Sequence, residues 1–110
     1  MTTIVIQKTK SGSYQGFYCM GHAGYAKKHE KDILCASIST LTICTINALE
    51  QLGGEMLQYE ANEDTGFLKC DFQSNLQEKS VFLMDAMVFS LESLAEEYGK
   101  KYLQIKFEEV

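Results

Sequence analysis

A long apolar segment at residues 33–49 separates two segments that have the pattern of β-hairpins. Its isoleucine, leucine and alanine residues form a run of helical length, and Gly53 and Gly54 follow it as helix stop signals. Because the run is apolar on most of its circumference, it predicts a helix that is largely buried. Such a helix needs cover on more than one side, and a dimer contact is one candidate for the second cover.

Two hairpins are predicted where β-prone residues flank turn-forming ones, with strands at residues 4–6, 14–20, 55–60 and 66–72. Apolar residues at spacings of three and four predict a second helix over residues 74–98, with Ser74 and Asn75 as cap candidates and Gly99 at its end. Residues 102–107 alternate as a last strand. The order ββαββαβ predicts an α+β fold in which a mixed sheet packs with two helices.

The length of 110 residues is that of one domain, so residues 1–110 are expected to form a single domain. The first residues, MTTIVIQKTKSG, lack the features of a signal peptide, and no apolar run approaches membrane-spanning length. A soluble, cytoplasmic protein without membrane contact is therefore expected. In that reducing compartment the four cysteines are expected to be free thiols.

The net charge is -5, and every basic residue other than histidine is a lysine. Proteins that bind nucleic acid directly neutralise phosphates with lysine and arginine, so this charge balance argues against a nucleic-acid surface. An acidic surface suits a basic protein or peptide partner, although many domains are acidic for solubility alone.

Cys35 is predicted to lie in the first turn of the helix that follows Asp32, the expected N-cap. Unpaired backbone N–H groups and the positive end of the helix dipole favour an anion at that position. Cys35 is thus the thiol most prone to ionise, while the negative charge of Asp32 opposes its ionisation. A nearby imidazolium would favour the ionised form of Cys35 over the neutral thiol.

His22 stands at the end of the second predicted strand, and the segment between it and Cys35 is long enough to bring its ring beside the helix start. A thiolate paired with histidine attacks a carbonyl, and the histidine then protonates the leaving amine. Gly21 and Gly24 permit a close approach or a positive φ, and first-turn N–H groups are candidates for stabilising an oxyanion. A single Cys–His pair is more often structural than catalytic, so a structural cysteine stays as an alternative.

Zinc binding is a further alternative, because Cys19 and His22 form a C-x2-H pair with Cys35 and Cys44 downstream. The wide spacing of Cys35 and Cys44 does not fit the second close ligand pair of a structural zinc site, so no metal or other cofactor is expected. Cys44 and Cys70 lie in apolar patterns and are predicted to be small buried hydrophobes.

Ser39 lies four residues after Cys35 and therefore on the same helix face. Its hydroxyl either binds the substrate backbone or, as is commoner, bonds within its own helix. The charged stretch KKHEKD at residues 27–32 is either an exposed loop or a mobile lid, and Tyr25 near it either packs the loop or contacts a peptide. Ser39, Gly21 and Tyr25 are the candidates for substrate binding.

Three short motifs follow one another in this part of the chain: Gly21-His22-Ala23, Asp32-Ile33-Leu34-Cys35-Ala36 and then Ser39. They resemble the G-H-A motif, the D-I-V-C-A motif and the nearby serine of the ribosomal-processing cysteine protease family, often called Prp. The length, the helix placement and the ending SLESLAEEYGK extend the resemblance over nearly the whole chain.

The resemblance implies a cysteine endopeptidase in which Cys35 is the nucleophile and His22 the general base, with Asp32 supporting the site and Ser39 near the substrate. Family members are homodimers that remove an apolar and aromatic N-terminal extension from a protein of the bacterial large ribosomal subunit. A ribosomal protein precursor and a second copy of the chain are therefore the implied partners. The alternative hypothesis is a non-catalytic ribosome-associated module that holds a basic protein.

Overall fold

The computed structural model describes residues 1–24 and 32–110 of the chain. The elements in these residues are β1 (Thr2–Lys8), β2 (Tyr14–Met20), α1 (Ile33–Gln51), β3 (Leu57–Asn62), β4 (Phe67–Phe72), α2 (Glu78–Tyr98) and β5 (Leu103–Glu109). This is the predicted ββαββαβ order, so the α+β class is confirmed.

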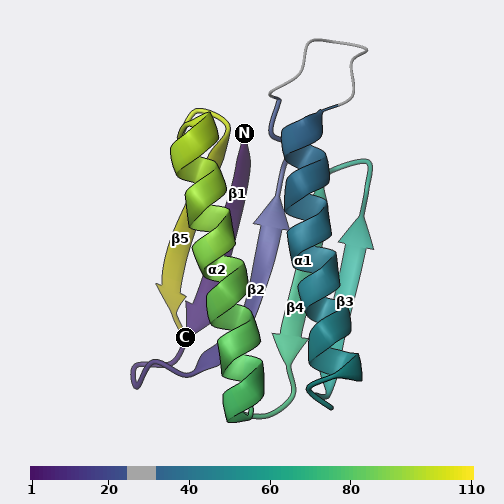
Figure 1. Ribbon diagram of the computed structural model, residues 1–110, viewed down its shortest axis with the longest axis vertical. Helices are drawn as coiled ribbons and strands as arrows, with labels where there is room; N and C mark the ends of the chain where they lie inside the picture. The colour runs from purple at the N-terminus through teal and green to yellow at the C-terminus, as the bar shows by residue number, and fades with distance from the viewer. Residues whose placement is uncertain (25–31) are drawn as a thin grey trace.

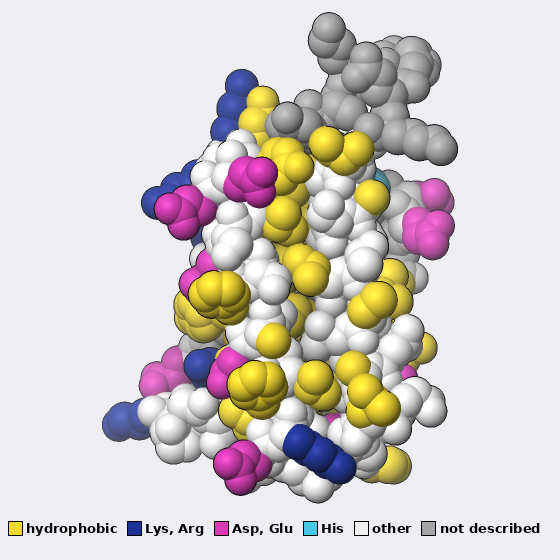
Figure 2. All heavy atoms as spheres, in the orientation of Figure 1, with side chains coloured by type: hydrophobic (Ala, Val, Ile, Leu, Met, Phe, Trp, Pro, Cys, Tyr) yellow, Lys and Arg dark blue, Asp and Glu magenta, His cyan; other side chains and the backbone are white. Residues whose placement is uncertain are grey.

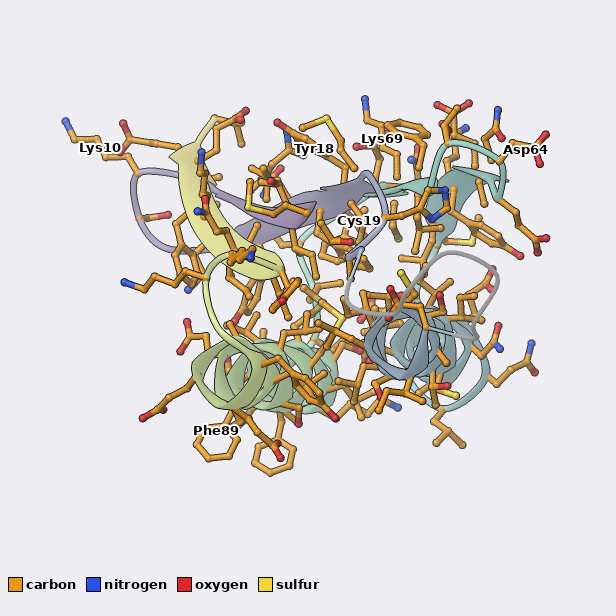
Figure 3. The ribbon with its side chains drawn as sticks, turned by 90° about the horizontal axis from the view of Figure 1, so that it is seen from above. Lys10, Tyr18, Cys19, Asp64, Lys69 and Phe89 are labelled. Carbon is orange, nitrogen blue, oxygen red and sulfur yellow. The ribbon has the colours of Figure 1, made fainter. Side chains whose placement is uncertain are left out.

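The strands form one mixed sheet in the order β3-β4-β2-β1-β5, in which β1 and β5 are parallel and the other neighbours antiparallel. Both helices lie on the same face of the sheet (Figure 1), and the view from above shows sheet and helices as two layers (Figure 3). The C-terminal end of β2, the start of α1 and the turn between β3 and β4 all lie at one end of the sheet (Figure 1). The predicted mixed sheet with two helices is confirmed, and its connections place the segment after β2 beside the start of α1.

The core lies between the sheet and the helices and is built from inward-facing strand positions and one stripe of each helix. Its strand residues include Ile4, Ile6, Phe17, Cys19, Cys70, Phe72 and Leu103, and its helix residues include Leu34, Ile38, Ile46, Leu49, Met84, Met87 and Leu91. Full burial of one such aliphatic or aromatic side chain contributes about 1.5–3 kcal/mol. This packing fixes the position of both helices on the sheet.

The start of α1 has the predicted N-cap. Asp32 has extended backbone angles, with φ of -86° and ψ of 102°, and its carboxylate accepts a hydrogen bond from the backbone N–H of Cys35. The Oδ1 to N distance is 3.0 Å. Such a bond satisfies one of the N–H groups that have no partner within the helix. Asp32 therefore determines where α1 begins and places Cys35 in its first turn.

The prediction that α1 is largely buried is wrong for the single chain. Its buried residues form one stripe with a spacing of three to four: Leu34, Ile38, Thr42, Ile46 and Leu49. The opposite side is exposed, with Ile33 at 56%, and Cys44 is exposed instead of buried. The reason is that both helices share one face of the sheet, so the sheet and α2 cover α1 on one side and nothing in the described residues covers its outer side.

The length and hydropathy of α1 correct a second prediction. The helix has 19 residues, and an 18-residue window within it has a mean hydropathy of 1.5, so that by length and composition this helix is able to cross a membrane. The prediction that no apolar run approaches that length is therefore wrong. These two properties are weak evidence of a membrane span, because the core helix of a soluble protein shares them.

The start of α2 lies four residues after the predicted cap at Ser74. The N-cap is Gln77, whose side chain makes no capping bond to its own helix. Its backbone N–H donates to Oε2 of Glu55 at 3.1 Å, and its side-chain Nε2 donates to the carbonyl of Gly53 at 3.0 Å. The start of α2 is thus held by the segment after α1, which is distant in sequence, and the local signal at Ser74 and Asn75 is overridden.

The second hairpin and the last strand are confirmed with shifted boundaries. β3 begins at Leu57 rather than at residue 55, because Glu55 is only 9% exposed and bonds to the start of α2. β5 extends to Glu109, since it pairs in parallel with β1 as far as Lys8.

Candidate active site

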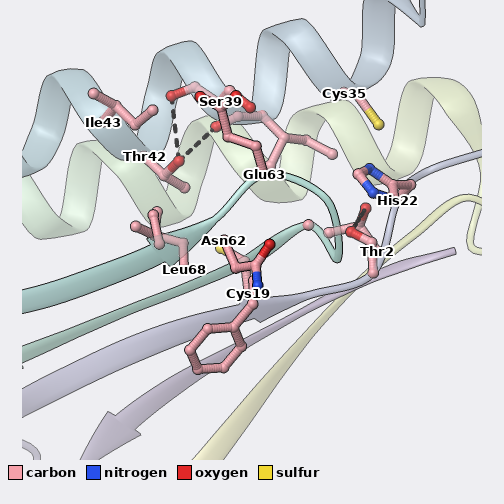
Figure 4. A pocket seen from close by; sticks show the side chains of 15 residues that line it. Thr2, Cys19, His22, Cys35, Ser39, Thr42, Ile43, Asn62, Glu63 and Leu68 are labelled. Carbon is pink, nitrogen blue, oxygen red and sulfur yellow. Dashed lines mark hydrogen bonds between the residues drawn. The ribbon is translucent and has the colours of Figure 1, made fainter.

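A pocket of about 350 Å³ opens where the start of α1, the segment after β2 and the β3–β4 turn, residues 62–66, come together (Figure 4). Its polar lining includes Thr2, His22, Cys35, Ser39, Thr42, Asn62 and Glu63. Its apolar lining includes Cys19, Ile38, Ile43, Ala61, Phe67 and Leu68. The pocket therefore joins a thiol and an imidazole to an apolar surface that suits hydrophobic side chains of a ligand.

Cys35 is half-buried in the first turn of α1, and its Sγ accepts a hydrogen bond from the backbone N–H of Ala23 at 3.1 Å. This bond, together with the positive end of the helix dipole, stabilises negative charge on the sulfur. Because Ala23 directly follows His22, the bond also holds the histidine segment against the start of α1. The structure thus brings the two predicted catalytic residues to one site.

His22 is exposed, and its imidazole lies at the same pocket as the thiol (Figure 4). Its Nε2 is hydrogen-bonded to the backbone carbonyl of Asp64 in the β3–β4 turn at 3.0 Å. Among the described residues, no hydrogen bond joins the imidazole of His22 to the thiol of Cys35. The turn therefore anchors the ring of His22 at the pocket that Cys35 also lines.

Asp32 and Ser39 act on different parts of the site. The carboxylate of Asp32 bonds to the backbone of Cys35, so it positions the first turn that carries the thiol. Ser39 lies one turn further along and lines the pocket. Within the described part of the chain its hydroxyl makes no hydrogen bond, whereas that of Thr42 bonds back to the carbonyl of Ile38 at 2.9 Å. The Ser39 hydroxyl is thus available to a ligand.

The two remaining substrate-binding candidates have different outcomes. Gly21 lines the pocket with a φ of +82°, and its carbonyl accepts a hydrogen bond from Oγ1 of Thr2 at 3.1 Å. A side chain at this position would lie 2.6 Å from the carbonyl oxygen of Met1, so glycine is required there. Tyr25 lies outside the described residues, as do residues 27–31 of the charged stretch.

The β3–β4 turn is the part of the site that the sequence did not indicate. Asn62, Glu63 and Gly66 line the pocket, and the backbone of Asp64 holds His22. The sequence identifies Asn62, Glu63 and Asp64 only as a turn, and Gly66 only as the first residue of the strand that follows. The missing information is the pairing of β2 with β4, whose last described pair, Cys19 with Leu68, sets the turn beside the segment that follows β2.

The other cysteines have surroundings unlike those of Cys35. Burial raises the pKa of Cys19 and of Cys70 to about 12, and nearby Asp71 and Glu50 add to the increase at Cys70. Both therefore stay neutral thiols near neutral pH. Cys44 is exposed on the outer side of α1 and does not line the pocket.

The donors named by the zinc hypothesis are not gathered into a ligand set. Among the described residues no group of three or more histidine, cysteine, aspartate or glutamate side chains is placed to hold a metal ion. Cys44 in particular lies away from the pocket that Cys19, His22 and Cys35 share.

A thiol in the first turn of a helix and an imidazole on the same pocket form the arrangement that cysteine peptidases use. Over residues 1–104 the chain matches the family described as "Cysteine protease Prp". The chain therefore belongs to the Prp family of cysteine proteases, which are hydrolases.

A relative from Bacillus subtilis (strain 168), the ribosomal processing cysteine protease Prp, is 26% identical over 102 residues, which cover 89% of this chain and 90% of the relative. The essential ribosomal processing protease Prp from S. aureus, solved with a covalently linked product peptide, has a TM-score of 0.88 at 21% identity, covering 98% of this chain and 100% of that one. SMU.848 from Streptococcus mutans has a TM-score of 0.85 at 28% identity, covering 100% of this chain and 96% of that one. The S. aureus likeness concerns the fold.

Proposed function

We propose that the chain is the endopeptidase that removes an apolar and aromatic N-terminal extension from a protein of the bacterial large ribosomal subunit, with Cys35 as nucleophile and His22 as general base. The observation that carries the proposal is the placement of Cys35. Its sulfur lies in the first turn of α1, accepts the N–H of Ala23 and faces the pocket that His22 also lines.

In this mechanism His22 takes the proton of the Cys35 thiol, and the thiolate attacks the carbonyl carbon of the scissile peptide bond. Backbone N–H groups at the start of α1 stabilise the oxyanion that forms. The imidazolium then gives its proton to the leaving amine, which departs and leaves a thioester on Cys35. Water, deprotonated by His22, hydrolyses the thioester and restores the thiol.

In this proposal the remaining site residues bind the substrate or position the nucleophile. Asp32 holds the backbone of Cys35, and Ser39, Gly21 and Tyr25 contact the substrate. The apolar lining at Ile38 and the neighbouring positions accepts hydrophobic side chains of the extension. The net charge of -5 favours a basic substrate such as a ribosomal protein. Residues 1–110 act as a single protease domain in the cytoplasm.

The proposal includes a homodimer. α1 and α2 leave large apolar side chains on their outer side, with Phe82 at 73% and Phe89 at 74% exposed, and Figure 2 shows apolar side chains gathered over both helices. A second copy would provide the cover that the apolar sequence of α1 requires. Sedimentation equilibrium is expected to give twice the chain mass, and less for Phe89→Glu; a monomeric wild type would contradict the dimer.

The catalytic assignment is tested with Cys35→Ala and the matched variant Cys44→Ala, which changes an exposed thiol on the same helix. Each is incubated with a recombinant ribosomal protein precursor, and the products are read by mass spectrometry. Cys35→Ala is expected to abolish cleavage with an unchanged circular dichroism spectrum, whereas Cys44→Ala keeps wild-type activity.

Cleavage by Cys35→Ala at the wild-type rate would exclude this mechanism. A wild type that binds the precursor without cleaving it would instead favour the non-catalytic ribosome-associated module.

A further inference from the structure

We propose that the β3–β4 turn orients the His22 imidazole and fixes its tautomer, with the backbone carbonyl of Asp64 accepting Nε2–H so that Nδ1 carries the lone pair that takes the proton of Cys35. The inference rests on the proposed function. It assigns the third member of the site, which orients the base, to a backbone carbonyl, whereas the family resemblance implied the carboxylate of Asp32 as support.

A hydrogen bond joins the His22 ring to the backbone of Asp64. Nε2 lies 3.0 Å from the carbonyl oxygen of Asp64. A carbonyl oxygen has no proton to give, so Nε2 is the donor. A neutral imidazole carries one proton, and the other nitrogen, Nδ1, is then an acceptor. The turn therefore selects the nitrogen that acts as the base.

Hydrogen bonds within the β3–β4 turn hold this carbonyl in place. The side-chain Oδ1 of Asn62 accepts hydrogen bonds from the backbone N–H groups of Asp64 at 3.0 Å and Thr65 at 3.4 Å. The N–H of Gly66 donates to the carbonyl of Glu63 at 3.3 Å. An asparagine that bonds two residues ahead in this way fixes the local backbone. Asn62 thus holds the peptide group whose carbonyl anchors His22.

The turn also packs closely against Gly21 and His22. Gly66 has a φ of +69°, and a Cβ there would lie 2.5 Å from the carbonyl oxygen of Gly21 and 3.2 Å from Nδ1 of His22. A side chain at this position would therefore push the turn away from the backbone and ring of the proposed base. Gly54 has nearly the same φ, +66°, but a Cβ there would meet nothing within 4 Å.

The two halves of the proposed catalytic pair thus have separate anchors. Asp32 holds the backbone of Cys35, and the β3–β4 turn holds the ring of His22. Residues of the turn are positioning residues because they act through His22. Loss of the turn's anchor is expected to leave the thiol in place and to misdirect the base.

The direct test is heteronuclear NMR of the His22 ring in nitrogen-labelled whole protein, with His22→Gln used to assign its signals. At a pH where the ring is neutral, Nε2 is expected to be the protonated nitrogen and Nδ1 the unprotonated one. A ring protonated on Nδ1, or an even mixture of tautomers, would overturn the proposal. The tautomer is read without any substrate, so a protein that cleaves no precursor yet shows this tautomer would refute the proposed function alone.

Two pairs of variants extend the test, with iodoacetamide alkylation of Cys35 as a second readout. Gly66→Ala is expected to lower the alkylation rate near neutral pH by on the order of 10-fold and to remove the tautomer preference, since an unactivated thiol is still a few per cent ionised at that pH. Gly54→Ala carries the same backbone strain and is expected to keep both wild-type properties. Equal effects of the two substitutions would contradict the proposal.

If Gly66→Ala does not fold, Asn62 decides the question. Asn62→Ala removes the bonds to Asp64 and Thr65 and is expected to shift the His22 tautomer, whereas Asn62→Asp keeps an acceptor oxygen and is expected to restore it. A wild-type tautomer in folded Asn62→Ala would contradict the role of the turn.

Discussion

The two helices of this protein begin in different ways, and the difference separates what a chain encodes locally from what the fold adds. α1 begins at a side chain directly before it, because Asp32 accepts the N–H of Cys35. α2 begins at a residue whose own side chain makes no cap, and Glu55 accepts the N–H of Gln77 from 22 residues away. Local capping gives α1 a start that the sequence reveals, and the proposed nucleophile is placed there.

The largest expected effect on stability comes from breaking the start of α2. Glu55→Ala removes a nearly buried carboxylate that accepts a backbone N–H, a type of bond that contributes about 1.5–3 kcal/mol. A loss near 2 kcal/mol would lower the Tm by roughly 8 °C in a chain of this length. Calorimetry of the variant and of Glu55→Gln, which keeps an acceptor oxygen, measures the effect.

Because the two helices begin independently, Glu55→Ala is expected to leave the reactivity of Cys35 at the start of α1 unchanged. Alkylation of Cys35 in the folded variant is expected at the wild-type rate. A Tm equal to that of the wild type would show that Gln77 does not depend on Glu55.

A smaller effect is expected at the start of α1. Asp32→Ala removes the N-cap and is expected to lower the free energy of unfolding by about 1 kcal/mol, a shift in Tm of roughly 4 °C. Asp32→Asn retains a capping oxygen and is expected to recover most of this loss. Urea denaturation of the three proteins side by side measures the difference, and an unchanged midpoint for Asp32→Ala would count against the cap.

The smallest effect is expected at Ser74, the residue that local pattern nominates as the cap of α2. Since the helix begins four residues later, Ser74→Ala is expected to change the free energy of unfolding by less than about 0.5 kcal/mol. The same denaturation experiment applies. A loss as large as that of Asp32→Ala would mean that Ser74 caps the helix after all.

The sequence predicts those parts of the fold and site that depend on neighbours along the chain. The ββαββαβ order follows from periodicity and turn residues, and the position of Cys35 follows from the cap at Asp32. The exposure of Cys44 was not predicted, because an apolar pattern does not show that both helices share one face of the sheet.

The surroundings of His22 were also beyond prediction, for a related reason. Its anchor, the carbonyl of Asp64, is 42 residues away and carries no side-chain signal. The contact exists because β2 pairs with β4, and a strand pairing of this kind is set by the whole sheet.

The central claim is that Cys35 and His22 form an activated pair, and site-resolved alkylation across a range of pH tests it most directly. Iodoacetamide labelling of all four cysteines is followed by mass spectrometry in the wild type and in His22→Ala, with exposed Cys44 as the internal reference. The account predicts that Cys35 reacts at a lower pH than Cys44, that His22→Ala moves its profile towards that of Cys44, and that buried Cys19 and Cys70 stay unlabelled. A Cys35 profile that matches that of Cys44 and does not respond to His22→Ala would contradict the account.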